Sequence, residues 1–478
     1  MKRIKVLIVL SLLLSAFFCT AQKKAASFKL MEYGTKTPVA YGGERSDSPV
    51  YVPCAYRAKK NEFRGVWVST IENIDIGKYS SAAAFRSAYN TIVSNLKNAG
   101  FNAIIFQVRP MNDAFYPSRL NPWSRWMTGS EGAAFADEPA FDPLRYMVNT
   151  AHRAGLEFHA WLNPYRVISR TPLSKEKYLK TLDPKNFARK NPHLVLAIPY
   201  DGGRMLILNP GEPQVIRFLL QTVQEIVKKY NVDAIHFDDY FYPYADVGSA
   251  DAATFKKYAA KGETLENWRR RNVDTFIYSL SVMLRKHNQT AKKNVKLGIS
   301  PFGIWANQSL TPAELAKKAK AETKAKTEKD DTKKTQSRAE GSLTGGAQSY
   351  FKQFADTRRW VRSGWIDYIV PQLYWGFSHR TAPYAALADW WAGCVRGTKC
   401  RLYTGHAVYR LGSKSADWKH PMELTCQLLY NSVRPDIHGV VFFSYVRIFQ
   451  PQNRVKKNEA QRIIRTLWRK KYPAEAKK

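Results

Sequence analysis

Short apolar runs rich in β-branched residues alternate along the chain with longer segments whose apolar residues recur every three or four positions. The longer segments are typical of amphipathic helices and include SAAAFRSAYNTIVSNLKNAG, DPLRYMVNTAHRAG and PQVIRFLLQTVQEIVKKY, with Gly100 and Gly155 where two of these helices should end. Eight runs have the length of a buried strand: RGVWVST near Val66, NAIIFQVRP near Ile104, EFHAWLNPYR near Ala160, DAIHFDDYF near Ile235, KLGISPFG near Ile299, DYIVPQLYW near Ile369, RLYTGHAVY near Tyr403 and GVVFFSY near Phe442. This alternation predicts an α/β fold, a single (β/α)8 TIM-type barrel with long loop insertions.

The predicted barrel at 61–472 is flanked by an N-terminal extension at 22–60 and a short C-terminal tail at 473–478. Within the barrel, residues 310–346 contain AKKAKAETKAKTEKDDTKKTQSRAEG, which is almost entirely polar and charged and has no apolar face. This composition is typical of disorder. We therefore interpret 310–346 as a disordered Lys-rich insertion in the loop after the fifth strand.

The first 21 residues, MKRIKVLIVLSLLLSAFFCTA, combine a basic start, an apolar stretch at 6–18 and small residues ahead of Gln22. This is the pattern of a cleaved signal peptide. Lipidation at Cys19 is the alternative, which the bulky Phe17 and Phe18 before it disfavour. No later stretch approaches about 18 continuous apolar residues, so no transmembrane segment is expected. The sequence predicts export to the periplasm or cell envelope.

Basic residues outnumber acidic residues by 75 to 39, which gives a formal net charge of +36. Such an excess favours an anionic neighbour, either nucleic acid or the polymers and lipid head groups of a cell envelope. The excess is spread along the chain, and export would separate the protein from nucleic acid. We expect peripheral contact with an anionic envelope surface and no nucleic-acid partner, and the oligomeric state stays open.

Four cysteines, Cys54, Cys394, Cys400 and Cys426, follow the predicted signal. In an exported chain they permit up to two disulfides of open connectivity. Their spacing does not match a zinc site, because no second Cys-x-x-Cys motif or histidine pair accompanies them. We expect neither a metal nor a cofactor.

Polar and aromatic side chains recur at the ends of successive predicted strands, where barrel enzymes carry their active sites. A single buried polar residue is usually a satisfied core residue, but leaving many unpaired would cost about 1–3 kcal/mol each. A polar cleft that binds substrate explains the whole set better. The candidate binding residues are Gln107, Arg109, His159, Trp161, Asn163, Tyr165, Arg166, His236, Tyr240, Ser300, Gln372, Tyr374, Trp375 and His406.

Two adjacent aspartates, Asp238 and Asp239, follow the apolar run AIHF. Strand alternation places Asp238 inside the barrel with His236 and leaves Asp239 at the rim. Like charges this close push one pKa upward, and glycoside hydrolysis needs two carboxyl groups with different roles. Either aspartate alone could instead cap a helix or pair with an arginine, but the two together favour a catalytic pair.

At these residues the sequence resembles the glycosyl-hydrolase-like family ten, divergent barrel proteins of bacterial envelopes. The resemblance runs from Glu62 to about Tyr445 and rests on strings such as FRGVWVSTIENIDI, FNAIIFQVRPMNDAFYPS, VDAIHFDDYFYPY and ADTRRWVRSGWIDYIVPQLYW. The family's FDDY motif falls on Asp238 and Asp239, its QVRP motif on Gln107 and Arg109, and its WLNPYR motif on 163–166. Relatives include a divisome-associated hydrolase, so the resemblance implies cleavage of peptidoglycan glycan strands that lack stem peptides. The lysine-rich insertion is longer than usual in the family, and no peptidoglycan-binding module is attached.

The expected reaction is hydrolysis of an amino-sugar glycan, with one of Asp238 and Asp239 as general acid and the other, or Asp113 or Asp75, as its carboxylate partner. The seventh strand ends without a carboxylate, so a substrate N-acetyl group could serve as nucleophile. Trp161, Tyr374 and Trp375 would form the sugar platform, and Arg109, Asn163 and Gln372 would hold hydroxyl or acetamide groups. Two alternatives stay open: a metal-dependent deacetylase with ligands from His236 and the aspartates, and a glycan-binding barrel without catalysis.

Overall fold

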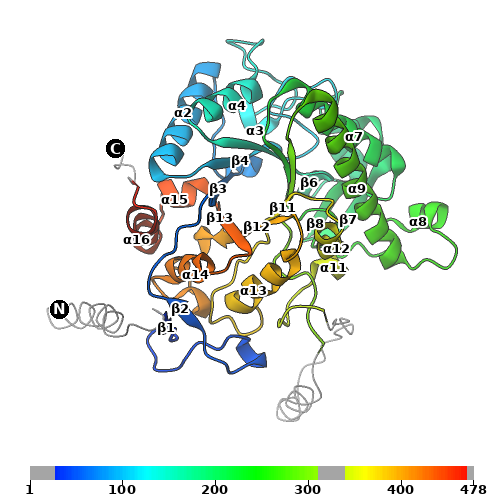
Figure 1. Ribbon diagram of the computed structural model, residues 1–478. Coiled ribbons are helices and arrows are strands. Elements are labelled where there is room, and N and C mark those ends of the chain that lie inside the picture. Colours follow the sequence, from blue (N-terminus) through cyan, green and yellow to red (C-terminus); the bar gives the residue numbers. More distant parts are fainter. Residues whose placement is uncertain (1–26, 310–339, 471–478) are drawn as a thin grey trace.

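The computed structural model describes residues 27–309 and 340–470 of the 478-residue chain (Figure 1). The predicted signal peptide at 1–21, the C-terminal tail at 473–478 and most of the predicted insertion lie outside these residues. None of the described helices is both long and apolar enough to cross a membrane.

Within the described residues, eight parallel strands close into a barrel in the spatial order β10–β11–β12–β13–β3–β4–β5–β9. Each lies within or overlaps a predicted strand, so the predicted (β/α)8 barrel is confirmed. Both faces of these strands are covered, which explains their continuous apolar runs. The strands are β3 (Phe63–Val68), β4 (Ala103–Arg109), β5 (Glu157–Leu162), β9 (Ala234–Phe237), β10 (Lys296–Ile299), β11 (Tyr368–Ile369), β12 (Arg401–Ala407) and β13 (Ile437–Phe443).

Helices surround the strands (Figure 1), and the three predicted from periodicity are α2, α4 and α7. The Ser81 hydroxyl caps the start of α2, and Gly100 ends it with a φ of +82°. Asp142 caps the start of α4, and Gly155, with a φ of +77°, follows its end. The helices are α2 (Ala82–Ala99), α3 (Arg125–Thr128), α4 (Pro143–Arg153), α5 (Lys175–Thr181), α6 (Phe187–Lys190), α7 (Pro213–Lys229), α8 (Ala252–Tyr258), α9 (Leu265–Ala291), α11 (Ser349–Lys352), α12 (Thr357–Arg362), α13 (Tyr384–Val395), α14 (Glu423–Ser432), α15 (Tyr445–Phe449) and α16 (Arg454–Arg462).

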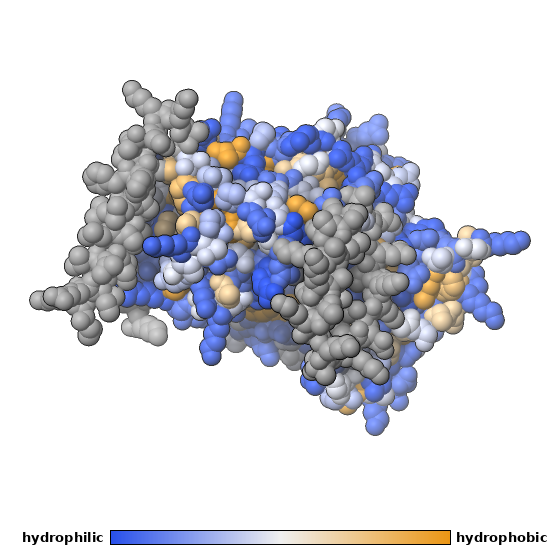
Figure 2. All heavy atoms as spheres, turned by 90° about the horizontal axis from the view of Figure 1, so that it is seen from below, coloured by the Kyte–Doolittle hydropathy of each residue, from blue (hydrophilic) through white to orange (hydrophobic). Residues whose placement is uncertain are grey.

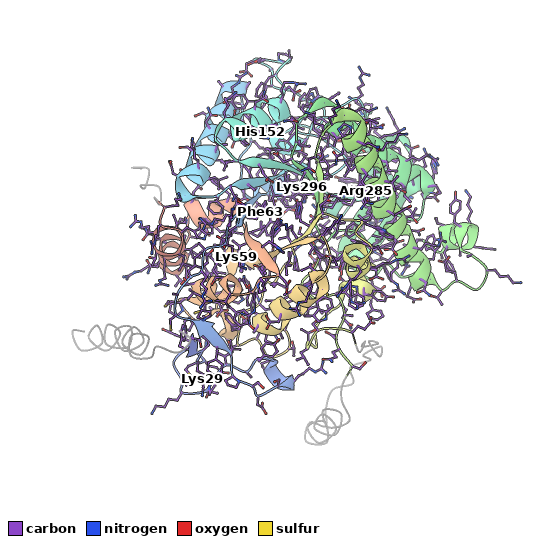
Figure 3. All side chains as sticks on the ribbon, in the orientation of Figure 1. Lys29, Lys59, Phe63, His152, Arg285 and Lys296 are labelled. Atoms are coloured by element: carbon purple, nitrogen blue, oxygen red, sulfur yellow. The ribbon has the colours of Figure 1, made fainter. Side chains whose placement is uncertain are left out.

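Two small antiparallel sheets lie outside the barrel. β6 (Arg166–Thr171), β8 (Gly203–Leu208) and β7 (Val195–Tyr200) form one of them between β5 and α7. β1 (Ser27–Lys29) and β2 (Tyr51–Pro53) form the other within the described part of the N-terminal extension. This extension is fastened to the barrel, because Lys59 donates hydrogen bonds to the carbonyls of Asn431 (2.9 Å) and Arg434 (2.5 Å). Figure 3 shows Lys59 close to the barrel strands and Lys29 at the periphery.

The end of the predicted insertion is folded against the barrel. The amide of Ser342 donates to the carbonyl of Ala306 (2.9 Å), and the hydroxyl of Thr344 donates to Asn307 Oδ1 (2.7 Å). Ser342 and Thr344 are both buried. The predicted boundary at residue 346 is therefore wrong, because these small polar residues find partners on the loop that follows β10.

Aromatic rings fill the barrel interior around Phe63, Tyr368 and Tyr403. The rings of Phe63 and Tyr403 stack at 4.0 Å between centroids. The Tyr368 hydroxyl lies 2.8 Å from His159 Nδ1 and 3.0 Å from His236 Nδ1, so these buried polar groups are paired. The interior is thus packed below the carboxyl ends of the strands, where an open cavity begins.

Within the described residues, the disulfides that the sequence permits among the four cysteines are not formed. Cys394, Cys400 and Cys426 are buried free thiols, so no bridge joins any two of the four cysteines considered. Burial raises the pKa of the Cys394 thiol to about 12, which keeps this group protonated and inert at neutral pH.

The face of the molecule seen in Figure 2 is largely hydrophilic, with small scattered hydrophobic patches. Such scattered patches are ordinary on a protein surface.

Candidate active site

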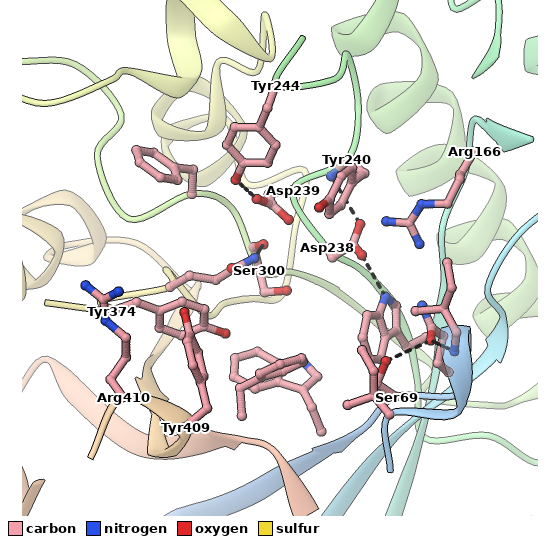
Figure 4. Close-up of a pocket in the computed structure, with 18 of the residues that line it drawn as sticks. Ser69, Arg166, Asp238, Asp239, Tyr240, Tyr244, Ser300, Tyr374, Tyr409 and Arg410 are labelled. Carbon is pink, nitrogen blue, oxygen red and sulfur yellow. Dashed lines mark hydrogen bonds between the residues drawn. The ribbon is translucent and has the colours of Figure 1, made fainter. Parts of the chain in front are cut away.

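A cavity of about 490 Å³ opens at the carboxyl ends of the barrel strands (Figure 4). Ten of the residues predicted from the sequence line it, together with Ser69 and Tyr409, which also follow predicted strands. The ten are Gln107, Trp161, Arg166, Asp238, Asp239, Tyr240, Ser300, Gln372, Tyr374 and Trp375. The predicted location of the site at this end of the barrel agrees with the position of this cavity.

Asp238 lies at the inner wall of the cavity and is 5% exposed. One oxygen, Oδ2, accepts hydrogen bonds from the Trp161 indole (3.2 Å) and the Asn163 amide, while Oδ1 accepts from the backbone N–H of Tyr240 (3.1 Å). Burial raises the pKa of Asp238, and Arg166 with these donors opposes that rise. Three donors and a nearby cation favour the ionised carboxylate at this position.

Asp239 is buried as deeply, at 4% exposed, but has different neighbours. The Tyr244 hydroxyl donates to its Oδ2. Burial, and then the neighbouring Asp238, raise the pKa of Asp239 to about 7. The prediction of Asp239 at the rim is therefore wrong: β9 ends at Phe237, so both aspartates belong to the following loop, where strand alternation no longer applies.

A hydrogen-bonded network holds Asp238 from below. Asn163 Oδ1 accepts from Gln107 Nε2 (2.6 Å) and Arg166 Nη1 (2.9 Å), which directs the Asn163 amide nitrogen toward Asp238. Gln107 Oε1 in turn accepts from the backbone amides of Thr70 and Ile71, each at 2.9 Å. The network ties the ends of β3, β4 and β5 to one carboxylate, which restricts the rotamer of Asp238.

Aromatic rings wall the rest of the cavity. Phe302 and Trp375 meet edge to face with 5.3 Å between ring centroids, and Tyr374 meets Tyr409 at 5.9 Å. The predicted platform of Trp161, Tyr374 and Trp375 therefore lines a single cavity. Flat apolar rings beside buried carboxyl groups suit a ligand with both apolar faces and hydroxyl groups, such as a sugar.

Asp75 and Asp113 do not reach the cavity, so their predicted role as carboxylate partners is wrong. Asp75 accepts hydrogen bonds from the Ser69 amide (2.8 Å), the Val446 amide (2.8 Å) and the Ser444 hydroxyl, so it joins the loops after β3 and β13. Asp113 accepts from the Met111 amide and the Ser124 hydroxyl and shapes the loop after β4. Asp113 is buried and Asp75 is partly buried, and both satisfy backbone donors.

Five further predicted contacts face away from the cavity, and Asn163 reaches it only through Asp238. His159 and His236 lie deeper in the barrel on Tyr368. His406 points outward from β12, because Tyr403 occupies the interior and side chains alternate along a strand. Its Nδ1 atom lies 2.8 Å from Gln427 Oε1 of α14. Arg109 and Tyr165 are fully buried, and Arg109 donates to the Asn163 carbonyl (2.5 Å) and Asn112 Oδ1 (2.6 Å).

Seven further residues line the cavity, and the pattern of strand ends did not predict them: Trp67, Ile71, Ile74, Tyr244, Phe302, Arg410 and Phe443. Tyr244 belongs to the string FDDYFYPY, so its proximity to Asp239 was a usable signal. Trp67 and Phe443 read as ordinary core residues of apolar strands. Arg410 follows β12 by three positions, and nothing in its surrounding sequence distinguishes it.

The deacetylase alternative loses its proposed ligand set. His236 Nε2 lies 3.2 Å from the Trp67 indole nitrogen and 3.0 Å from the Ser300 hydroxyl, and Nδ1 faces Tyr368. Both ring nitrogens therefore have protein partners. Within the described part of the chain, no three His, Cys, Asp or Glu side chains are grouped so that they could hold a metal ion.

Comparisons with known proteins find related sequences over most of the chain. The model of the family "Glycosyl hydrolase-like 10" matches residues 62–420. "Glycosyl hydrolase YngK" of Bacillus subtilis is 34% identical over 403 residues, which cover 83% of this chain and 70% of that protein. "Glycosyl hydrolase DigH" of Escherichia coli K12 is 33% identical over 438 residues, or 87% of this chain and 89% of that protein. Among solved structures, the chitobiase of Flavobacterium johnsoniae superposes with a TM-score of 0.41 at 11% identity, over 84% of this chain and 48% of that one.

The family match covers most of the chain, and the two relatives align over at least two thirds of their own length. The resemblance read from the sequence is therefore confirmed, and the fold and family support a glycoside-hydrolase-like function. This chain belongs to the glycosyl hydrolase-like 10 family.

Proposed function

We propose that the protein is an exported glycoside hydrolase that cleaves an amino-sugar glycan, with peptidoglycan strands lacking stem peptides as substrate. The observation that carries the proposal is the pair of buried adjacent carboxyl groups with unequal surroundings in an aromatic-walled cavity. Family membership supports the hydrolase-like chemistry. The basic and apolar pattern at 1–21 supports export, which the N-terminal residue of the protein purified from cells would test.

Asp239 is the proposed general acid. Its raised pKa of about 7 leaves much of this carboxyl protonated near neutral pH, and its position on the cavity surface lets it protonate the departing glycosidic oxygen. Asp238, with donors on both oxygens, is the proposed ionised partner. Two neighbouring carboxyl groups with different donors supply the two charge states that glycoside hydrolysis requires.

Among the described residues that line the cavity, Asp238 and Asp239 are the only carboxylic acids. Both follow the same strand, so they cannot bracket a glycosidic bond in the way that a separated acid and nucleophile do. We therefore propose that the acetamide oxygen of the substrate attacks the anomeric carbon as the glycosidic C–O bond breaks. Asp239 gives its proton to the leaving oxygen, Asp238 accepts the acetamide N–H, and water then opens the cyclic intermediate with Asp239 as base.

The decisive experiment incubates the purified protein with peptide-free glycan strands and with intact sacculi, and identifies products by mass spectrometry. We expect new reducing ends from the peptide-free strands. Asp238→Asn and Asp239→Asn should each slow cleavage by at least about 100-fold. Asp436→Asn is the matched control, because this residue pairs with Arg396 next to the amino end of β13, away from the cavity.

A wild-type protein that retains the strands but releases no fragments would contradict the proposed hydrolysis and leave a glycan-binding barrel. Equal rates for the wild type and both Asn variants would contradict the assignment of the aspartates. Cleavage of intact sacculi as fast as peptide-free strands would contradict the proposed substrate.

A further inference from the structure

Arg410 is a cation on the cavity wall whose side chain forms no hydrogen bond or ion pair with any residue that the structure describes. It ends η4 (Val408–Arg410), the short 3-10 turn directly after β12, and is partly buried. Among the described residues its guanidinium forms no ion pair, and its Nε atom is buried without an acceptor. An arginine usually has hydrogen-bond acceptors when its nitrogens are withdrawn from water, because an unpaired buried donor costs free energy.

The backbone that carries Arg410 is held in place. The amide of Leu411 donates to the Val408 carbonyl (3.2 Å), and the amide of Ser413 donates to the Arg410 carbonyl (3.0 Å). The Asn453 side chain also donates to the Leu411 carbonyl (3.1 Å). The fold therefore fixes the origin of this side chain beside the cavity, and only the guanidinium end remains to be satisfied.

Nearby acidic groups do not supply the missing acceptor. Asp417 and Arg410 both act on the pKa of His379, so Asp417 is one acid close to this region. Its carboxylate accepts instead from the Gly376 amide (2.9 Å) and the Ser415 hydroxyl. Asp239 raises the pKa of Tyr409 and Arg410 lowers it, so Asp239 is a second acid in this region. Neither aspartate lies within ion-pair distance of Arg410.

The second arginine of the cavity has a different environment. Arg166 donates to Asn163 (2.9 Å) and to the Pro110 carbonyl (3.3 Å), and it lies over the Tyr240 ring at 4.2 Å from the centroid. It also opposes the rise in the pKa of Asp238. In Figure 4 Arg166 and Arg410 stand on opposite sides of the two aspartates. Arg166 thus balances Asp238, whereas the charge of Arg410 is left for a ligand.

We propose that Arg410 binds a carboxylate carried by a sugar of the substrate, next to the bond that Asp239 protonates. A guanidinium pairs bidentately with a carboxylate. A single negative charge also suits a cavity that already holds Asp238, whereas a phosphate would add more repulsion. The inference rests on the proposed function and narrows its substrate to acidic glycans. Its sources are the lactyl ether group of a muramic acid or the ring carboxylate of a uronic acid.

This assignment gives a physical reason for a preference for strands without stem peptides. A stem peptide is joined to the lactyl carboxyl group through an amide bond, which removes the negative charge. Arg410 would then face a neutral amide and lose its charge-assisted hydrogen bonds. Removal of the peptide restores the lactyl carboxylate and with it the ion pair to Arg410.

The test measures dissociation constants by calorimetry in an Asp239→Asn background, where turnover does not deplete the ligand. Four oligosaccharides of equal length serve as probes: a muramic-acid oligomer with free lactyl carboxylates, its methylamide, a hyaluronan fragment with uronic acids, and neutral chitin. We expect Arg410→Gln to raise the dissociation constant of the free muramic-acid oligomer by roughly 10- to 100-fold. The dissociation constants of the methylamide and of chitin should stay unchanged. Arg410→Lys should restore part of the loss. Arg217→Gln is the control, because Arg217 is exposed on α7 and has no ion pair within residues 27–309 and 340–470.

If Arg410→Gln also weakens binding of the hyaluronan fragment, the site recognises sugar carboxylates in general. If binding of that fragment is unchanged, the site recognises the lactyl group. Equal weakening of acidic and neutral oligomers, or no weakening, would overturn the role of Arg410. These results are independent of turnover. If binding is selective for the carboxylate but the wild type does not hydrolyse glycan, only the proposed reaction is rejected. If the wild type hydrolyses glycan but Arg410→Gln weakens acidic and neutral oligomers equally, only this inference is rejected.

Discussion

Asp238 and Asp239 are chemically identical neighbours that the loop after β9 places in different surroundings. Asp238 has hydrogen-bond donors on both oxygens, whereas Asp239 accepts from the Tyr244 hydroxyl and lies beside the Gln372 amide. This difference separates their protonation states in the way that catalytic carboxyl pairs require. The titration belongs to the pair as a whole, so pH profiles report apparent values for both groups.

The dependence of the hydrolysis rate on the leaving group should show which aspartate is the general acid. An aryl glycoside of N-acetylglucosamine with a good leaving group needs little protonation, so Asp239→Asn should impair its hydrolysis far less than the roughly 100-fold loss expected on glycan strands. Asp238→Asn should impair both substrates alike. For the wild type, kcat/KM on glycan strands should fall as pH rises through about 7, because the proton on Asp239 is then lost.

Both readouts come from initial rates across pH 5 to 9. Equal losses on the two substrates in Asp239→Asn, or a rate that increases through pH 7, would contradict the acid role of Asp239.

The sequence predicted the carboxyl pair and most of the cavity, because strand ends in a closed barrel converge on one face. It failed where a loop turns a polar side chain back onto the fold. Asp75 and Asp113 satisfy backbone amides, and a sequence does not show which donors a loop will present. Arg410 was not predicted for a different reason, since a single arginine just after a strand is usually an ordinary surface residue.

At the scale of elements, the barrel strands were predictable because burial on both faces makes them continuous apolar runs. The three-stranded sheet of β6, β7 and β8 was not predicted, although its hairpin had a signal. Asp201 and Gly202 both have positive φ values of +46° and +68° and connect β7 to β8 in a two-residue turn. An Asp-Gly pair between apolar runs is a strong hairpin signal, so this sheet was within reach of the sequence.

Two glycines make the packing of the barrel testable. A Cβ added at Gly298 in β10 would lie 1.8 Å from the Tyr368 ring, which contacts both buried histidines. Gly298→Ala should therefore destabilise the protein by about 1–3 kcal/mol or more through overpacking. Gly393 in α13 has no atom within 4 Å of that position, so Gly393→Ala should be neutral or stabilise by up to about 1 kcal/mol.

Urea unfolding of both variants measures this difference, with activity on glycan strands as a second readout. Equal stabilities for the two alanine variants would show that the barrel interior around Tyr368 adapts to the extra methyl group.

At the scale of the whole molecule, the net charge and the buried ionisable groups affect different properties. The formal charge of +36 concerns partners and solubility, whereas the buried carboxyl groups concern stability. Burial raises the pKa of Glu423 to about 8, and burial is also the main reason that the pKa values of Glu459 and Asp239 lie at about 7. Buried histidines act in the opposite direction, since burial lowers the pKa of His406 to about 4. The two effects oppose one another only below pH 6.5, where unfolded histidine is protonated.

Between pH 6.5 and 8 the carboxyl groups should therefore dominate. The folded protein retains protons that the unfolded chain, with carboxyl pKa values near 4, has already released. Unfolding then releases protons, so the free energy of unfolding falls as pH rises, by about 3 kcal/mol across this interval for the three groups together. Glu423→Gln should remove about half of that fall, because its folded pKa is the highest of the three and a glutamine oxygen can still accept from the Phe377 amide. Urea unfolding at pH 6.5 and pH 8 measures both slopes, with the exposed Glu138→Gln as the same substitution at the surface. A wild-type stability that is constant or rises over this interval would show that water reaches these carboxyl groups in the folded protein.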